Sequence, residues 1–184
     1  MRIVGGTARG KRLRVPKSRR VRPTTDRVRE AVFQILGDLT DVAVVDAFAG
    51  TGALGAEAWS RGAKFVYFFD ADRHAIEIVR DNTTQLRMTD DCSVRQQDFF
   101  RGQKTIAREI QLWFVDPPYH RGIAQDAIHA IAQHPFAVDD GLVVVEQDRR
   151  ESLEMPRGLE CEDRREYGDT QIHFLRRVPA GARD

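Results

Sequence analysis

Apolar residues along the chain fall into two alternating patterns. Short runs of apolar residues predict buried strands, and segments with apolar residues at every third or fourth position predict amphipathic helices. The predicted strands are 42–46, 65–70, 93–98, 112–116 and 142–146. The predicted helices are 25–39, 53–61, 73–88 and 122–134. Strands that alternate with helices in this way are typical of a parallel sheet with helices on both faces.

The pattern changes after Pro156. Two β-type runs follow, Leu159 to Tyr167 and Gln171 to Arg177, and Gly168-Asp169 separates them. Glycine beside aspartate suits the positive backbone angles of a tight hairpin turn. The predicted fold is therefore α/β, with a mostly parallel sheet that a C-terminal antiparallel hairpin extends. The segment 93–98 is polar, which is typical of a strand at or near an edge of the sheet.

Charge is distributed unevenly along the chain. Residues 1–25 carry nine Lys/Arg and no acidic residue, whereas the remaining chain holds 20 basic and 28 acidic residues. A cationic arm on an acidic body predicts a polyanionic partner for the arm, and the alternative is a solvated basic tail without a specific partner. Alternating apolar residues predict a small hairpin within the arm (Ile3, Val4, Leu13 and Val15). We therefore divide the chain into a basic extension, 1–24, and one domain, 25–184.

The remaining composition points to the cytoplasm. Cys92 and Cys161 have no metal-type spacing with each other or with the histidines, so we expect free thiols in a reducing compartment and no metal. The longest apolar runs are too short to span a bilayer, and the first residues lack the apolar core of a secretory signal.

A glycine-rich loop follows the first predicted strand. Gly50, Gly52 and Gly55 have the spacing of the dinucleotide fingerprint, which predicts a cofactor that contains adenosine. However, Asp46 comes before these glycines, and a carboxylate there would repel a pyrophosphate. It suits a cation instead, such as the ammonium or sulfonium end of S-adenosylmethionine. The glycines would then let the backbone approach the methionine portion.

Four predicted strands end in aspartate: Asp46, Asp70, Asp98 and Asp116. One aspartate at the end of a strand is usually a turn residue. Because ligands bind outside the carboxyl ends of parallel strands, four on one rim favour a site. In that site Asp70 can accept both ribose hydroxyls, and Asp98 can accept the adenine amine with Phe99 against the ring.

The strand that ends at Asp116 continues into Asp116-Pro117-Pro118-Tyr119. Consecutive prolines stiffen this turn and remove two backbone donors, which leaves a carboxylate and carbonyls to accept hydrogen bonds from an amine. Bonds to Asp116 and to the Pro117 carbonyl would localise the lone pair of an exocyclic amine, and a base can stack on Tyr119. The turn therefore predicts transfer of a methyl group to a base nitrogen, by positioning and electrostatics.

These motifs resemble known enzymes. Asp-x-Phe-x-Gly-x-Gly at 46–52 together with DPPY at 116–119 is similar to the Rossmann-like class I methyltransferases that modify exocyclic amines of nucleic-acid bases. The opening 2–10, the run 22–30 and Tyr167-Gly168 resemble, more narrowly, the bacterial RsmD family of 16S ribosomal RNA guanine-N2 methyltransferases. The resemblance covers almost the whole chain in order.

The resemblance implies S-adenosylmethionine as cofactor, S-adenosylhomocysteine as product, and ribosomal RNA or the small ribosomal subunit as partner of a monomer. It implies cofactor contacts at Asp46, Phe48, Ala49, Gly50, Gly52, Asp70, Ala71, Asp98 and Phe99. The target guanine would lie at Asp116, Pro117, Pro118 and Tyr119. The RNA would lie along Arg2, Arg9, Lys11, Arg12, Arg14, Arg19, Arg20 and Arg22. One departure is Asp70, where relatives often carry glutamate.

Other interpretations stay open at this stage. Arg22 or Arg27 is a candidate contact to RNA or to the cofactor carboxylate, whereas His120 is not needed as a base because the amine proton can leave after transfer. The same turn occurs in DNA methyltransferases that act on base amino groups. A non-catalytic RNA-binding assembly factor and, more distantly, an NAD oxidoreductase are the alternatives of other classes. Cytosine C5 methylation would need a nucleophilic cysteine in the active-site loop, and neither cysteine is so placed.

Overall fold

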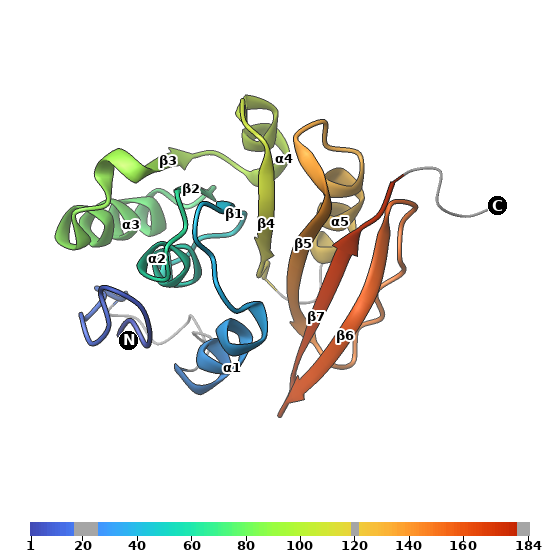
Figure 1. Cartoon of the computed structure of the whole chain (residues 1–184), viewed down its shortest axis with the longest axis horizontal. Coiled ribbons are helices and arrows are strands. Elements are labelled where there is room, and N and C mark those ends of the chain that lie inside the picture. Colours follow the sequence, from blue (N-terminus) through green and yellow to red (C-terminus); the bar gives the residue numbers. More distant parts are fainter. Residues whose placement is uncertain (17–25, 119–121, 180–184) are drawn as a thin grey trace.

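A computed structural model describes residues 1–16, 26–118 and 122–179. Its strands form one seven-stranded sheet in the order β3-β2-β1-β4-β5-β7-β6 (Figure 1). The strands are β1 (Ala43–Asp46), β2 (Phe65–Asp70), β3 (Cys92–Gln96), β4 (Ile110–Val115), β5 (Ala137–Asp148), β6 (Leu159–Tyr167) and β7 (Thr170–Arg177). The helices are α1 (Asp26–Leu36), α2 (Ala53–Ser60), α3 (Arg73–Leu86), α4 (Phe99–Gly102) and α5 (Ile123–Ala132), with the 3-10 turns η1 (Thr89–Asp91) and η2 (Gln103–Thr105).

The predicted architecture is confirmed. Strands β3, β2, β1, β4 and β5 are parallel neighbours, and β7 pairs antiparallel with both β5 and β6. The polar strand β3 lies at one edge, as its composition predicts, and β6 lies at the other. The strands β1, β2 and β3 follow one another towards one edge of the sheet, and the strands from β4 onwards lie towards the other edge. The strand order therefore reverses between β1 and β4, where a ligand crevice is expected in such sheets.

Both faces of the sheet are buried, which explains why its central strands are continuous apolar runs. In β1, Val44 faces a cluster that includes Phe33 of α1, while its neighbour Val45 faces a cluster that includes Ile128 of α5. Helices α1, α2 and α3 thus cover one face, and α4 and α5 cover the other (Figure 1). The rings of Phe33 and Phe114 lie 5.5 Å apart and join α1 to the middle of the sheet.

Some predicted boundaries are wrong. The strand predicted at 93–98 ends at Gln96, so Asp98 is not a strand residue. Its side chain instead accepts a hydrogen bond from the Arg101 amide and caps α4, a four-residue helix too short for apolar periodicity to reveal. Strand β5 is longer than the predicted 142–146 because its first residues, Ala137 to Gly141, are a mixed segment with no clear strand pattern.

The first residues form a hairpin-like turn that is packed onto the body. Arg2 and Arg12 make an antiparallel bridge, the Ile3 amide donates to the Lys11 carbonyl, and the Gly10 amide donates to the Ile3 carbonyl. Ile3, Ala8 and Leu13 are buried in the same apolar cluster as α1, α2 and α3. The hairpin prediction is thus confirmed for residues 1–16, and the rest of the predicted extension lies outside the described residues.

Polar contacts fix this hairpin to α2. The Thr7 amide donates to the Ser60 carbonyl, and the Ala8 amide donates to the Ser60 hydroxyl. Gly6 has φ +72°, and a Cβ atom at Gly6 would lie 1.8 Å from the Ser60 carbonyl oxygen. Only glycine therefore fits this approach of the hairpin to the helix.

Gly55, the third glycine of the fingerprint, has a packing role. A Cβ atom there would lie 2.3 Å from Cε1 of the buried Phe68 and 2.8 Å from Cγ1 of Val66. This glycine therefore allows α2 to lie close to β2. We expect Gly55→Ala to lower the free energy of unfolding by about 1–3 kcal/mol through overpacking, as measured by urea denaturation. An unchanged free energy would mean that the Phe68 ring can move aside without cost.

In the part of the chain that the structure describes, no helix is long and apolar enough to cross a membrane.

Candidate functional site

A cavity of about 720 Å³ opens at the carboxyl ends of the parallel strands, beside the reversal of strand order. Strand β1 ends at Asp46, which pairs with Phe114 of the neighbouring strand β4. Strand β4 ends at Val115, one residue earlier than predicted, and Asp116 is the first residue after it. Asp46 and Asp116 therefore flank the switch point, and both line the cavity. All four aspartates that the sequence places at strand ends, the other two being Asp70 and Asp98, border this one cavity.

The glycine loop between β1 and α2 forms one wall. Gly50 and Gly52 adopt the left-handed region, with φ +55° and +74°, so the loop turns sharply into α2. Asp70 holds this loop, because one of its carboxylate oxygens accepts the Gly50 amide at 2.8 Å. The other oxygen accepts the Asp72 amide at 2.8 Å. Each carboxylate oxygen retains a further lone pair that can accept a hydrogen bond from a ligand hydroxyl.

Asp46 is the deeply buried acid of the site, with 2% of its surface exposed. Burial raises its pKa to about 7, the hydrogen bond from the Gly55 amide opposes that rise, and the negative charge of Asp70 adds to it. The Gly55 amide lies 3.0 Å from the Asp46 carboxylate. A ligand cation beside Asp46 would favour the ionised form and remove much of this cost.

This raised pKa predicts a dependence of stability on pH. The unfolded chain ionises Asp46 near pH 4 and the folded protein near pH 7, so the folded state loses stability as the pH rises through that interval. Asp46→Asn retains an acceptor for Gly55 and removes the ionisation. Without ligand, we expect the variant to be more stable than wild type by about 2–4 kcal/mol at pH 8. Urea denaturation should show this gap shrinking towards pH 4, and a gap that does not change with pH would contradict the assignment.

Aromatic rings and Asp98 also border the cavity. Phe48 and Phe99 both line it, with ring centroids 5.7 Å apart, and Phe100 lies beside them. Phe99 is almost wholly buried, so only a small part of its ring is open to a ligand. The Asp98 carboxylate accepts the Arg101 amide at 3.1 Å. Asp98 thus has a structural role in capping α4 as well as a position on the cavity.

The acceptor turn follows β4. Asp116 is half-buried, Pro117 is buried and Pro118 is exposed, and all three line the cavity. The turn therefore faces the same space as the glycine loop, as the positions of the motifs predict. Tyr119 and His120 lie outside the described residues.

Most of the predicted cofactor residues border the cavity. These are Asp46, Phe48, Ala49, Gly50, Asp70, Ala71, Asp98 and Phe99. Gly52 does not line it and instead caps the start of α2. Sequence reasoning missed other lining residues, which are Met1, Arg29, Ala47, Thr51, Ala53, Leu54, Asp72, Ala75, Phe100, Ile123 and Glu146.

Arg29 is the most informative of the missed residues. Of the two arginines considered for a cofactor contact, Arg27 is exposed and does not line the cavity, and Arg22 lies outside the described residues. Arg29 lies on the buried side of α1 with Val28 and Val32. Arg29 could have been singled out from the sequence, because it is a charged residue on the apolar face of a predicted helix.

The basic residues predicted to contact RNA divide into two groups. Those on the docked hairpin are exposed: Arg2, Arg9, Lys11, Arg12 and Arg14. Arg14 pairs with Asp81 of α3, and its backbone amide donates to the Asn82 side chain at 2.7 Å. Arg19, Arg20 and Arg22 lie outside the described residues.

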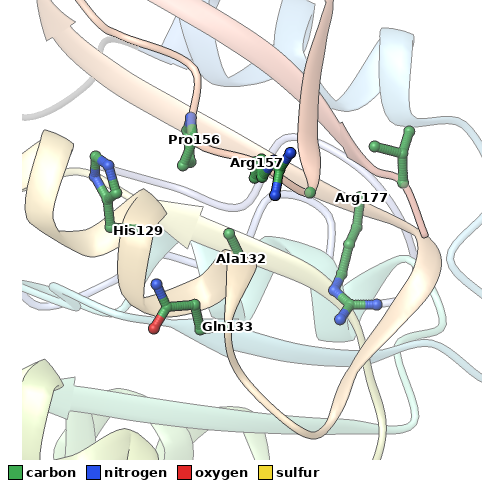
Figure 2. A pocket seen from close by; sticks show the side chains of 8 residues that line it. His129, Ala132, Gln133, Pro156, Arg157 and Arg177 are labelled. Carbon is green, nitrogen blue, oxygen red and sulfur yellow. The ribbon is translucent and has the colours of Figure 1, made fainter. Parts of the chain in front are cut away.

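A second cavity, of about 420 Å³, lies at the other end of the sheet, where β6 begins and β7 ends. Figure 2 shows its labelled side chains: His129, Ala132 and Gln133 from the end of α5, Pro156 and Arg157 from the segment before β6, and Arg177 from β7. None of the predicted site residues lines it. It is therefore separate from the cavity at the carboxyl ends of the strands.

Comparison with known proteins identifies relatives along most of the chain. A family model described as "Conserved hypothetical protein 95" matches residues 1–176. Ribosomal RNA small subunit methyltransferase D of Escherichia coli (strain K12) is 37% identical over 155 residues, which cover 83% of this chain and 77% of that protein. The Bacillus subtilis protein YlbH is 32% identical over 182 residues, which cover 96% of this chain and 99% of that protein. Among solved structures, Escherichia coli yhhF matches with a TM-score of 0.87 and 29% identity, over 97% of this chain and 98% of that one.

Proposed function

Since the chain belongs to the Conserved hypothetical protein 95 family, the RsmD family of ribosomal RNA methyltransferases, we propose that it methylates the N2 amine of a guanine in 16S ribosomal RNA. The methyl donor in this proposal is S-adenosylmethionine. The substrate is ribosomal RNA, free or within the small ribosomal subunit. Several curated relatives carry the name Ribosomal RNA small subunit methyltransferase D, which supports this substrate.

One observation carries the proposal. The acceptor turn Asp116-Pro117-Pro118 and the glycine loop with Asp46 border the same cavity, at the switch point of the sheet. A base amine held at the turn and a cationic methyl donor held at the loop would therefore meet within one cavity. Neither motif alone would place the methyl donor next to the base amine.

The residues of the cavity fit the proposed cofactor. Its acidic lining residues, which include Asp46, Asp70 and Asp98, suit a ligand that carries positive charge, hydroxyls and an amine. The raised pKa of Asp46 returns towards its usual range when a cation lies beside it. Phe48 and Phe99 supply apolar surface for an adenine ring. When bound, S-adenosylmethionine supplies an electrophilic methyl group, which leaves as the carbon–sulfur bond breaks with its electron pair on sulfur.

The chain contributes positioning to this reaction. In the proposal, the Asp116 carboxylate and the Pro117 carbonyl accept hydrogen bonds from the two protons of the guanine amine. These bonds orient the nitrogen lone pair towards the methyl carbon and disfavour its delocalisation into the ring. The nitrogen becomes cationic as it takes the methyl group and then loses a proton to water, so no strong base is required. The base must be unpaired or flipped out of a helix to reach the turn.

Two measurements test the proposal. S-adenosylhomocysteine should raise the melting temperature of the protein and NADH should not, because the acidic loop disfavours a pyrophosphate. Tritium transfer from labelled S-adenosylmethionine should reach 16S RNA or small ribosomal subunits, and duplex DNA should stay unlabelled. Labelled DNA with unlabelled RNA would support a DNA methyltransferase instead. Binding of RNA without any transfer would support a non-catalytic assembly factor.

A further inference from the structure

Arg29 is an unusual residue of the cavity because it is charged and wholly buried, with 0% of its surface exposed. It borders the cavity from α1. Its Nη2 atom donates to the Arg2 carbonyl and to the Asp26 carboxylate, the latter at 2.9 Å. Its Nε and Nη1 atoms are buried and have no hydrogen-bond partner in the described structure. A guanidinium keeps its charge in proteins, so two of its donor atoms are left without hydrogen bonds.

Glu57 only partly compensates Arg29. The distance from Arg29 Nε to the Glu57 carboxylate is 3.7 Å, which is an ion-pair distance and too long for a hydrogen bond. Each Glu57 oxygen already accepts a shorter bond, from the Val4 amide at 2.8 Å and from Arg61 Nε at 2.8 Å. Glu57 is therefore shared among three donors.

The ion pairs around Arg29 leave an excess of positive charge. Within the described residues, they join three arginines (Arg2, Arg29 and Arg61) to two carboxylates (Asp26 and Glu57). Of these five residues only Arg29 lines the cavity. One anionic group at the Arg29 side of the cavity would balance the cluster.

The charged side chains in the rest of the cavity lining repel an anion. The lining contains six acidic residues (Asp46, Asp70, Asp72, Asp98, Asp116 and Glu146), and Arg29 is the single Lys or Arg side chain among the described lining residues. S-adenosylmethionine carries one anionic group, the carboxylate of its methionine portion. Arg29 is the lining side chain that can donate hydrogen bonds to this carboxylate, because two of its donor atoms are unsatisfied. A planar guanidinium also matches the geometry of a carboxylate. Arg29 is wholly buried and borders only this cavity, so a phosphate of RNA bound at the protein surface would not reach it.

We propose that Arg29 binds the methionine carboxylate of S-adenosylmethionine and thereby positions the donor end of the cofactor. This assignment rests on the proposed function, since it concerns the same cofactor. It also links cofactor binding to the N-terminal hairpin, because the same guanidinium donates to the Arg2 carbonyl.

Binding of two ligands to the intact protein tests this assignment. Decarboxylated S-adenosylmethionine differs from the cofactor only in the loss of the carboxylate. Calorimetry should show that wild type binds S-adenosylmethionine about 10- to 100-fold more tightly than the decarboxylated form, as a charge-assisted hydrogen bond implies. In Arg29→Met this preference should disappear, because affinity for S-adenosylmethionine falls while affinity for the decarboxylated form stays. Arg61→Met is the matched control, since Arg61 also contacts Glu57 but does not line the cavity. Its preference should equal that of wild type.

The other outcomes are equally decisive. Equal affinity of wild type for the two ligands would overturn the role of Arg29 and leave the proposed function intact. Equal weakening of both ligands in Arg29→Met would assign Arg29 a purely structural role. If that variant does not fold, Arg29→Lys keeps the charge without the planar fork, and an unchanged preference in it would overturn a guanidinium-specific contact. Failure of wild type to bind either ligand would overturn the proposed function and this inference together.

Discussion

Asp116→Asn is expected to lower the rate of methyl transfer by about 10²- to 10³-fold, the size of effect seen when one preorganised hydrogen bond to a reacting group is removed. The asparagine keeps the shape of the aspartate but replaces one acceptor oxygen with an NH₂ group, which would face the protons of the guanine amine. The nitrogen would then lose its orientation and the stabilisation of its developing positive charge. Single-turnover transfer of labelled methyl to RNA measures this rate.

Two controls separate a catalytic effect from a structural one. Affinity for S-adenosylhomocysteine should change little in Asp116→Asn, since the glycine loop and Asp70 are intact. Asp126→Asn changes an exposed aspartate of α5, ten residues further along the chain, and should leave the rate unchanged. A normal rate in Asp116→Asn would remove the acceptor turn from the mechanism.

Neutralising the hairpin should weaken RNA binding strongly. Arg9, Lys11 and Arg12 are exposed, and none forms an ion pair with another described residue, so each is available to a phosphate. Changing all three to Gln should lower RNA affinity by about 100-fold at low salt and reduce the slope of log affinity against log salt by about 2–3. We leave Arg14 unchanged because it pairs with Asp81 of α3. Filter binding over a salt series measures both quantities.

A triple variant at the far edge of the sheet, with the same change in net charge, provides the control. Arg157, Arg164 and Arg165 are exposed and lie in or just before β6, the edge strand away from the hairpin. Changing these three arginines to Gln alters the net charge by the same amount as the hairpin variant does. It should have a much smaller effect on RNA affinity and on the salt dependence of that affinity. Equal losses in the two variants would mean that RNA responds to overall charge, and an unchanged affinity in the hairpin variant would mean that the hairpin is merely solvated.

The sequence predicts the framework of the fold well because its signals are local. Runs such as Phe65 to Asp70 are apolar on both faces, and Gly168-Asp169 marks the C-terminal hairpin, so these elements appear where the pattern places them. The rim of the site is also predictable, since the carboxyl ends of parallel strands must meet. Asp46, Asp70 and Asp116 therefore meet at one cavity without any long-range information.

Other features depend on packing between distant segments, which no local pattern reveals. Arg29 and Glu57 are polar residues of different helices, and their burial together follows from the docking of the N-terminal hairpin over both. Gly55 is required because the Phe68 ring lies against it, not because a ligand approaches it. Asp98 lies at the start of α4 and not at the end of a strand, and α4 is too short for apolar periodicity to predict it.

The most direct test of the central claim is identification of the methylated nucleoside. 16S RNA and small ribosomal subunits, each from cells that lack the corresponding modification, would be incubated with the protein and S-adenosylmethionine, digested to nucleosides and examined by mass spectrometry. The proposed function predicts N2-methylguanosine in at least one of the two substrates, and its loss in Asp116→Asn. Methyladenosine or methylcytidine as the product, or no methylated nucleoside from either substrate, would contradict it.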